Sequence, residues 1–156
     1  MKGLLKWPLI IAAILVVGRV LAERSGAPNW LSNSLSVVVL YLLIVPIYFG
    51  IKLGAPGVHR PYLSLFGTVA VYTALVRLMV IPTYWLAYIY QWPEGRFSTS
   101  ASGVVGEGVT PIMGYLLVPF GAALAWVVGT TIIGGAIGSM FIAGRRFASR
   151  ESVKSA

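Results

Sequence analysis

A single arginine lies inside a long apolar stretch of this chain, and its chemistry needs an explanation. Residues 62–90 contain no other charged side chain, and Arg77 lies near their midpoint. On insertion scales, an arginine at the centre of a membrane-spanning helix costs about 2.5–3.5 kcal/mol. Its five N–H donors cannot be removed by deprotonation, so Arg77 is expected to find acceptors within the protein.

Few groups in the sequence can accept hydrogen bonds from Arg77. Glu107 is the strongest candidate, because the glycines on both sides of it in GVVGEGV let the backbone fold close to the helices. The other candidates are the hydroxyls of Thr73, Tyr84, Thr130 and Thr131 and backbone carbonyls such as that of Leu78, which loses its helical partner at Pro82. We therefore predict a ligand or ion-pair site at Arg77, Glu107, Thr73 and Tyr84.

The helical face of Arg77 predicts that its side chain points into the protein. Small and hydroxyl-bearing residues, which suit a helix-packing seam, share this face. The face includes Thr73, Ala74 and Tyr84, while Val71, Leu75, Leu78 and Met79 project elsewhere. In a functional interpretation Arg77 holds an anion, a quinone-like carbonyl or a lipid headgroup, with Glu107 as a gate or counter-charge. In a structural one it forms an ion pair that fixes a loop to the bundle, or reaches the membrane surface.

A stripe of small residues in the last apolar stretch predicts close helix packing. Gly121, Ala125 and Gly129 repeat at four-residue spacing, and Gly134 and Gly138 continue the pattern one position over. Such stripes let two helices approach closely and gain dispersion contacts and Cα–H hydrogen bonds. The neighbour is either another helix of this chain or a second subunit, and the sequence leaves both open.

Metal, cofactor and covalent chemistry find little support in the residue types. The chain has no cysteine, one histidine, no aspartate and four glutamates, which offer few metal ligands. His59 lies in a short basic loop, where solvation is its expected state. The chain has neither a Ser-His-Asp set nor an HExxH motif, and GVVGEGV does not have the spacing of a phosphate-binding loop. We expect no metal and no cofactor, and catalysis is unsupported.

The composition predicts the elements that must position these residues. Of the 156 residues, 58% are hydrophobic and only 10% are charged, far from the average of soluble domains. We predict an all-α integral membrane protein, a four-transmembrane-helix bundle with kinks at Pro46, Pro82 and Pro119. The single membrane domain, 1–156, has spans at about 4–22, 30–51, 62–90 and 112–143 and a basic tail at 144–156. A cleaved signal peptide is the alternative for the first span, but Arg19 is unusual in such a segment.

The distribution of basic residues predicts the orientation. The N-terminus, the loop after the second span and the tail hold eight of the twelve lysines and arginines. By the positive-inside rule, both termini are cytoplasmic, as an even number of spans requires, in a bacterial-type inner membrane. The outer segment 93–111, rich in glycine and serine, is expected to be a flexible loop, and residues 111–118 either dip into the bilayer or add a helical turn.

Two classes of function are compatible with these features. The favoured one is a non-enzymatic accessory or scaffold subunit that acts through helix-helix and loop contacts with a membrane-protein partner or further copies of itself. The alternative is a small oligomeric transporter or channel with an anion- or carbonyl-binding site at Arg77 near Glu107. An enzyme acting on lipid or quinone headgroups ranks third, and nucleic-acid binding is disfavoured because the basic residues mark the ends of apolar segments.

Overall fold

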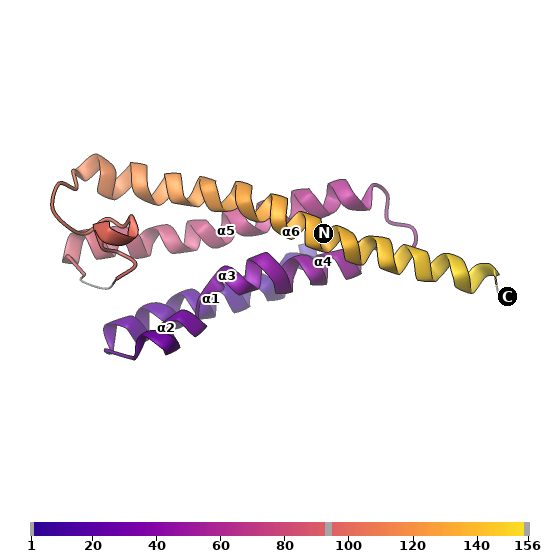
Figure 1. Cartoon of the computed structure of the whole chain (residues 1–156), viewed down its shortest axis with the longest axis horizontal. Coiled ribbons are helices and arrows are strands. Elements are labelled where there is room, and N and C mark those ends of the chain that lie inside the picture. The colour runs from indigo at the N-terminus through magenta and orange to yellow at the C-terminus, as the bar shows by residue number, and fades with distance from the viewer. Residues whose placement is uncertain (1, 93–94, 155–156) are drawn as a thin grey trace.

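The computed structural model describes residues 2–92 and 95–154, and within them the chain is helical apart from turns and one isolated β-bridge. Four helices are long and apolar enough to cross a membrane, as the sequence predicts: Gly3–Arg24, Trp30–Leu53, Pro61–Tyr90 and Met113–Ser149. They lie along the long axis of the molecule (Figure 1). The elements are α1 (Lys2–Arg24), α2 (Asn29–Ser34), α3 (Val37–Val39), η1 (Leu40–Ile44), α4 (Val45–Leu53), α5 (Pro61–Tyr90), η2 (Thr99–Ala101), η3 (Met113–Leu117) and α6 (Val118–Lys154).

The prolines expected to kink the helices are accommodated in two ways. Pro46 and Pro119 each follow a five-residue π-helical turn, η1 and η3 respectively, with one valine between turn and proline. Because proline lacks an N–H and its ring crowds the carbonyl four residues earlier, a widened turn relieves both problems. Pro82 instead lies inside α5, which continues without interruption to Tyr90. Residues 111–118 therefore form the helical entry to α6.

The helix α5 lies at the centre of the packing and contacts α1, α4 and α6, the last most extensively. Its fully buried residues Leu65, Val69, Tyr72 and Val76 form the middle of the core. The two halves of the expected small-residue stripe on α6 have different surroundings. Gly134 and Gly138 lie against Pro46 of α4, whereas a Cβ atom at Gly121 or Gly129 would meet nothing within 4 Å. Ala125, between the last two, is also exposed.

The helices α1 and α2 diverge from α5 and α6 toward one end of the molecule, at the left of Figure 1. We call this end, with residues 25–36, 91–92 and 95–112, the loop end, and the end with residues 54–60 the opposite end. At the opposite end α6 extends beyond the other helices (Figure 1), because its 37 residues span about 55 Å at 1.5 Å per residue. Residues 144–154 of the predicted tail are the last turns of this helix, and residues 155 and 156 lie outside the described part of the chain.

The segment between α5 and η3 makes packing contacts and hydrogen bonds that a flexible loop would lack. Phe97 and Val104 are fully buried, and Phe97 packs edge-on against Tyr84 of α5 with ring centroids 5.3 Å apart. A backbone N–H donates from Val105 to Phe97 O at 2.8 Å, and another from Thr99 to Val105 O at 2.9 Å. The aromatic anchor and the turn hold the residues on either side of them, including Arg96, against the loop end of the bundle.

Candidate functional site

Arg77 lies on the buried face of α5, with its side chain pointing into the protein. It is 8% exposed, while Val71, Leu75, Leu78 and Met79, expected on the other faces, are all exposed. Its Nη2 donates a hydrogen bond of 2.6 Å to the phenol oxygen of Tyr41, on η1. The neighbouring helix, and not a loop carboxylate, therefore supplies the acceptor.

Two aromatic rings provide the remaining contacts of the Arg77 guanidinium. Its central carbon lies 4.7 Å from the ring centroid of Trp126 on α6 and 5.4 Å from that of Tyr41. These rings meet edge to face with centroids 5.6 Å apart. Aromatic faces attract cations, by up to about 2 kcal/mol when the site is desolvated. The rings do not accept conventional hydrogen bonds, however, and Nε of Arg77 is buried without a hydrogen-bond partner among the described residues.

The structure does not bring Glu107 to Arg77. Glu107 is exposed, between Gly106 at φ 144° and Gly108 at φ 80°, and it makes no ion pair with any described residue. The glycines do free the backbone, as the sequence analysis assumes, but the resulting turn directs this carboxylate to the surface. Thr73 lies one turn from Arg77 and is fully buried, with no hydrogen-bond partner for its hydroxyl in the described chain. Tyr84 lines a cavity together with Arg77.

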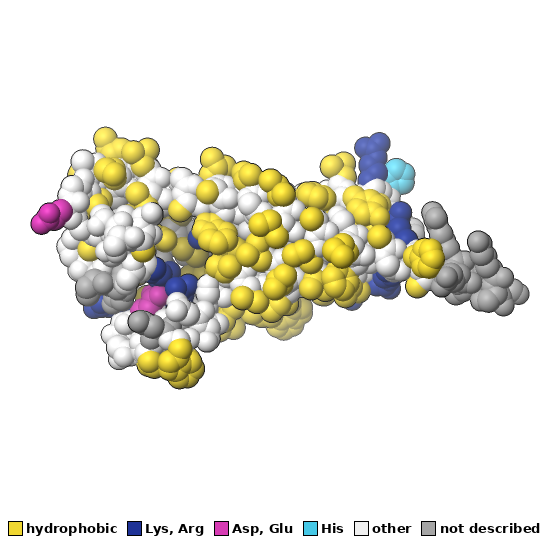
Figure 2. All heavy atoms as spheres, in the orientation of Figure 1, with side chains coloured by type: hydrophobic (Ala, Val, Ile, Leu, Met, Phe, Trp, Pro, Cys, Tyr) yellow, Lys and Arg dark blue, Asp and Glu magenta, His cyan; other side chains and the backbone are white. Residues whose placement is uncertain are grey.

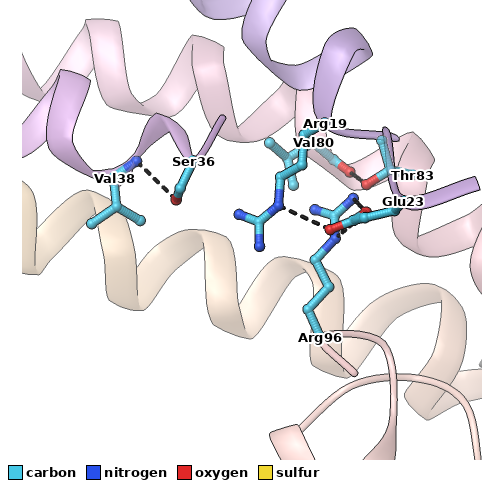
Figure 3. A network of polar contacts seen from close by, with 7 residues as sticks. All are labelled: Arg19, Glu23, Ser36, Val38, Val80, Thr83 and Arg96. Carbon is cyan, nitrogen blue, oxygen red and sulfur yellow. Dashed lines mark hydrogen bonds and ion pairs between the residues drawn. The ribbon is translucent and has the colours of Figure 1, made fainter. Parts of the chain in front are cut away.

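A second charged cluster at the loop end joins α1 to the segment after α5. Glu23 accepts a hydrogen bond of 3.0 Å from Nε of Arg19, one helical turn earlier, and one of 2.9 Å from Nε of Arg96 (Figure 3). Nη2 of Arg96 also lies 2.8 Å from the same carboxylate, although not in hydrogen-bond geometry. Burial lowers the pKa of Arg96, and the carboxylate of Glu23 opposes that shift. One carboxylate thus serves two arginines.

One cavity is lined by Arg77 and also by Arg19 and Arg96 of the second cluster. It has a volume of about 160 Å³ and lies between the diverging helices. A second hollow of about 290 Å³ shares Arg19 and Arg96 with it and adds Glu23, Ser32 and Asn33. Dark blue and magenta side chains are visible in a hollow at the loop end in Figure 2. The lining of the smaller cavity is Arg19, Ser36, Val37, Val38, Tyr41, Arg77, Val80, Tyr84, Arg96 and Trp126.

The charges around this cavity do not balance. Arg19, Arg77 and Arg96 line it, and Glu23 is the one carboxylate that contacts any of them in the described chain. The terminal nitrogens of Arg19 make no hydrogen bond to a described residue, and Figure 3 shows them pointing away from Glu23. Partly desolvated donors that lack acceptors favour the binding of an anion. We call this site the arginine cavity.

The sequence analysis missed five members of the site, although signals existed for some. Arg19 and Glu23 have the spacing of four that pairs opposite charges on a helix, but the sequence analysis considered Arg19 only as an argument against a signal peptide. Arg96 is the one basic residue between the last two spans. Tyr41 and Trp126 carry no such signal, since aromatic residues in apolar helices are common and nothing in the sequence pairs either with Arg77.

No group of three His, Asp or Glu side chains in the described residues is close enough together to hold a metal. Models of protein families, curated proteins and solved structures give no match to this chain. The function must therefore be argued from the arginine cavity itself.

Proposed function

We propose that this protein is a four-pass membrane protein, of a bacterial-type inner membrane, that binds an anionic group in the arginine cavity. The observation that carries the proposal is the excess of arginine over carboxylate in a site whose central arginine is 8% exposed. A buried guanidinium without a counter-anion is costly, and an anionic ligand supplies both charge and acceptors. The apolar surface of the middle of the molecule, visible in Figure 2, supports insertion in a bilayer.

The distribution of basic groups supports an orientation with the arginine cavity facing outward and both termini in the cytoplasm. Dark blue and cyan side chains gather at the opposite end in Figure 2. Two of the arginines there donate to backbone carbonyls, Arg145 to Ile51 at 2.5 Å and Arg146 to Val58 at 3.1 Å. By the positive-inside rule, this end is the cytoplasmic one.

Cysteine accessibility tests the orientation directly, because the chain has no native cysteine. Ala101→Cys, exposed at the loop end, should react with a membrane-impermeant maleimide on intact cells. His59→Cys, exposed at the opposite end, should react only after the membrane is permeabilised. The reverse pattern would overturn the orientation and place the cavity on the cytoplasmic side.

The same approach tests anion binding. Val38 lines the arginine cavity, while its neighbour Val39 is exposed on the outside of the bundle. With an anionic thiosulfonate reagent, Val38→Cys should react faster than with a cationic one, and Arg77→Gln should reduce that preference. Val39→Cys is the matched control and should show no such dependence on Arg77. Equal rates with both reagents at position 38 would refute an anion-attracting cavity.

An accessory or scaffold role is the second candidate function. It is favoured by the part of the small-residue stripe that remains open, Gly121, Ala125 and Gly129. If a partner helix packs there, Gly129→Leu should abolish a larger complex seen on native gels in mild detergent. Gly144→Leu, also on α6 with nothing within 4 Å of its Cβ position, is the control. A complex that survives Gly129→Leu, or migration as a monomer throughout, counts against this role.

A further inference from the structure

The donors without partners in the arginine cavity come from three different elements. Arg19 is on α1, Arg77 is on α5, and Arg96 lies in the segment after α5. The donors are the terminal nitrogens of Arg19, Nε and Nη1 of Arg77 and Nη1 of Arg96, none of which makes a hydrogen bond to a described residue. They do not form one planar fork, which is the arrangement that suits a single carboxylate.

The one carboxylate already in the cluster shows how a planar anion uses these arginines. Glu23 contacts Nε of Arg19 on one oxygen and Nε and Nη2 of Arg96 on the other. Arg77 makes no ion pair with Glu23, and the phenol oxygen of Tyr41 is the one described atom that accepts a hydrogen bond from Arg77. After Glu23 is counted, three arginines against one glutamate leave two positive charges in the cluster.

We propose that the ligand of the arginine cavity is a phosphate-bearing group. This inference rests on the anion-binding function proposed above and specifies its chemistry. A tetrahedral oxyanion directs oxygens toward several sides at once and carries up to about two charges, which matches three separate guanidinium groups better than a carboxylate does. The volume of about 160 Å³ far exceeds the roughly 10–15 Å³ that one water needs, so the cavity has room for a group larger than water.

The rest of the lining is compatible with two sources of phosphate. Val37, Val38 and Val80 supply apolar wall, and Tyr41, Tyr84 and Trp126 supply aromatic wall. Such walls accept the glycerol and ester portions of a phospholipid headgroup, and they also exclude water from a free phosphate or a soluble phosphate ester. The shared recognition element is the phosphate, and the experiment below separates the two sources.

The test uses the full-length protein purified in a maltoside detergent, which carries neither phosphate nor carboxylate. Calorimetry compares inorganic phosphate with acetate, and native mass spectrometry compares retention of phosphatidylglycerol with that of oleate. The variants are Arg77→Gln and Arg96→Gln, the second of which lies outside the spanning helices and serves if the first fails to fold. Arg60→Gln, exposed at the opposite end, removes the same charge as a matched control. Circular dichroism verifies that each variant is folded.

We expect the wild type and Arg60→Gln to bind a phosphate ligand at least about tenfold more tightly than the matched carboxylate. In Arg96→Gln the affinity for the phosphate ligand should fall by at least the same factor. Binding of inorganic phosphate identifies a free phosphate as sufficient, and retention of phosphatidylglycerol alone identifies the lipid. Acetate or oleate binding as tightly as its phosphate counterpart would overturn the phosphate assignment but leave anion binding intact. If none of the four ligands binds, or if binding is unchanged in both Arg77→Gln and Arg96→Gln, the proposed function fails as well.

Discussion

The phenol oxygen of Tyr41 lies 2.6 Å from Nη2 of Arg77, although the two residues are 36 positions apart in the chain. This contact joins η1 to α5 in the interior of the bundle. It takes the place of the ion pair with Glu107 that the sequence analysis favours, and Arg77 has no carboxylate partner among the described residues. This unmatched charge is the basis of the anion binding that we propose for the arginine cavity.

Tyr41→Phe should lower the free energy of unfolding by about 1–2 kcal/mol, because it removes the one acceptor that the described residues provide for a buried guanidinium. The ring remains, so the edge contact with Trp126 is kept. The measurement is unfolding by sodium dodecyl sulfate in mixed micelles, followed by circular dichroism. Tyr62→Phe is the control, since Tyr62 is exposed at the opposite end. Equal stability of both variants and the wild type would show that the hydrogen bond contributes little.

Glu23→Gln should loosen the segment after α5. The amide keeps the shape of the carboxylate but leaves Arg19 and Arg96 close together without a counter-charge, at a cost of about 2–4 kcal/mol for a partly buried pair. Hydrogen–deuterium exchange should accelerate at the amides of Thr99 and Val105, which are bonded within the turn that follows Arg96.

Glu107→Gln provides the matched control for this change. It removes the same charge at the same end of the molecule, but Glu107 is exposed and pairs with no described residue. Exchange at Thr99 and Val105 should stay at the wild-type rate. If Glu107→Gln accelerates exchange as much as Glu23→Gln does, then a general loss of negative charge explains the effect and the Glu23 bridge does not.

The sequence was sufficient to predict the four apolar helices and the inward direction of Arg77. Both follow from local properties, namely the length of uncharged segments and the positions that share a helical face. The partner of Arg77 could not be predicted in this way, because Tyr41 is 36 positions away and the contact depends on how η1 and α5 pack. Tyr41 was hidden among ordinary aromatic residues of an apolar helix.

The part of the arginine cavity that contains Arg19 and Arg96 could not be predicted, because it depends on tertiary structure. Arg96 donates a hydrogen bond to Glu23, which lies 73 positions earlier in the chain. This contact requires both the turn at residues 97–105 and the burial of Phe97 against α5. The glycines and serines of this segment indicated a flexible loop. The burial of the apolar side chains of Phe97 and Val104 outweighs that local preference and holds the segment against the bundle. The π-helical turns before Pro46 and Pro119 likewise reflect how a helix adapts to proline, for which the sequence predicted only a kink.

The buried hydroxyl of Thr130 offers a test of how dry the bundle is one helical turn from Trp126, whose ring contacts Arg77. Thr130 Oγ1 has no hydrogen-bond partner in the described chain, whereas its neighbour Thr131 donates to the carbonyl of Val127 at 2.6 Å. Thr130→Val should raise the free energy of unfolding by about 1 kcal/mol, because an unsatisfied hydroxyl is costly to bury. Thr131→Val, the control, should lower it slightly. A loss of stability in Thr130→Val would indicate that water satisfies this hydroxyl and that the bundle is hydrated at this depth.

Alanine substitutions along α6 should separate the two halves of its small-residue stripe. A Cβ atom at Gly138 would lie 2.7 Å from the carbonyl oxygen of Pro46 and 2.9 Å from a methyl group of Leu65. Because backbone cannot move aside cheaply, Gly138→Ala should destabilise the protein by about 1–3 kcal/mol. Gly129→Ala meets open space and should be neutral or stabilising by up to about 1 kcal/mol, the helix propensity of alanine over glycine.

The comparison of these two variants also bears on the accessory role. Unfolding of Gly138→Ala and Gly129→Ala in detergent reports packing within one chain, whereas native gels in mild detergent report packing between chains. Destabilisation confined to Gly138→Ala, with unchanged migration of Gly129→Ala, would mean that the stripe stabilises this chain alone. If Gly129→Ala leaves the isolated chain stable but dissociates a larger complex, the open half of the stripe at Gly121, Ala125 and Gly129 contacts a second helix, and the accessory role is supported.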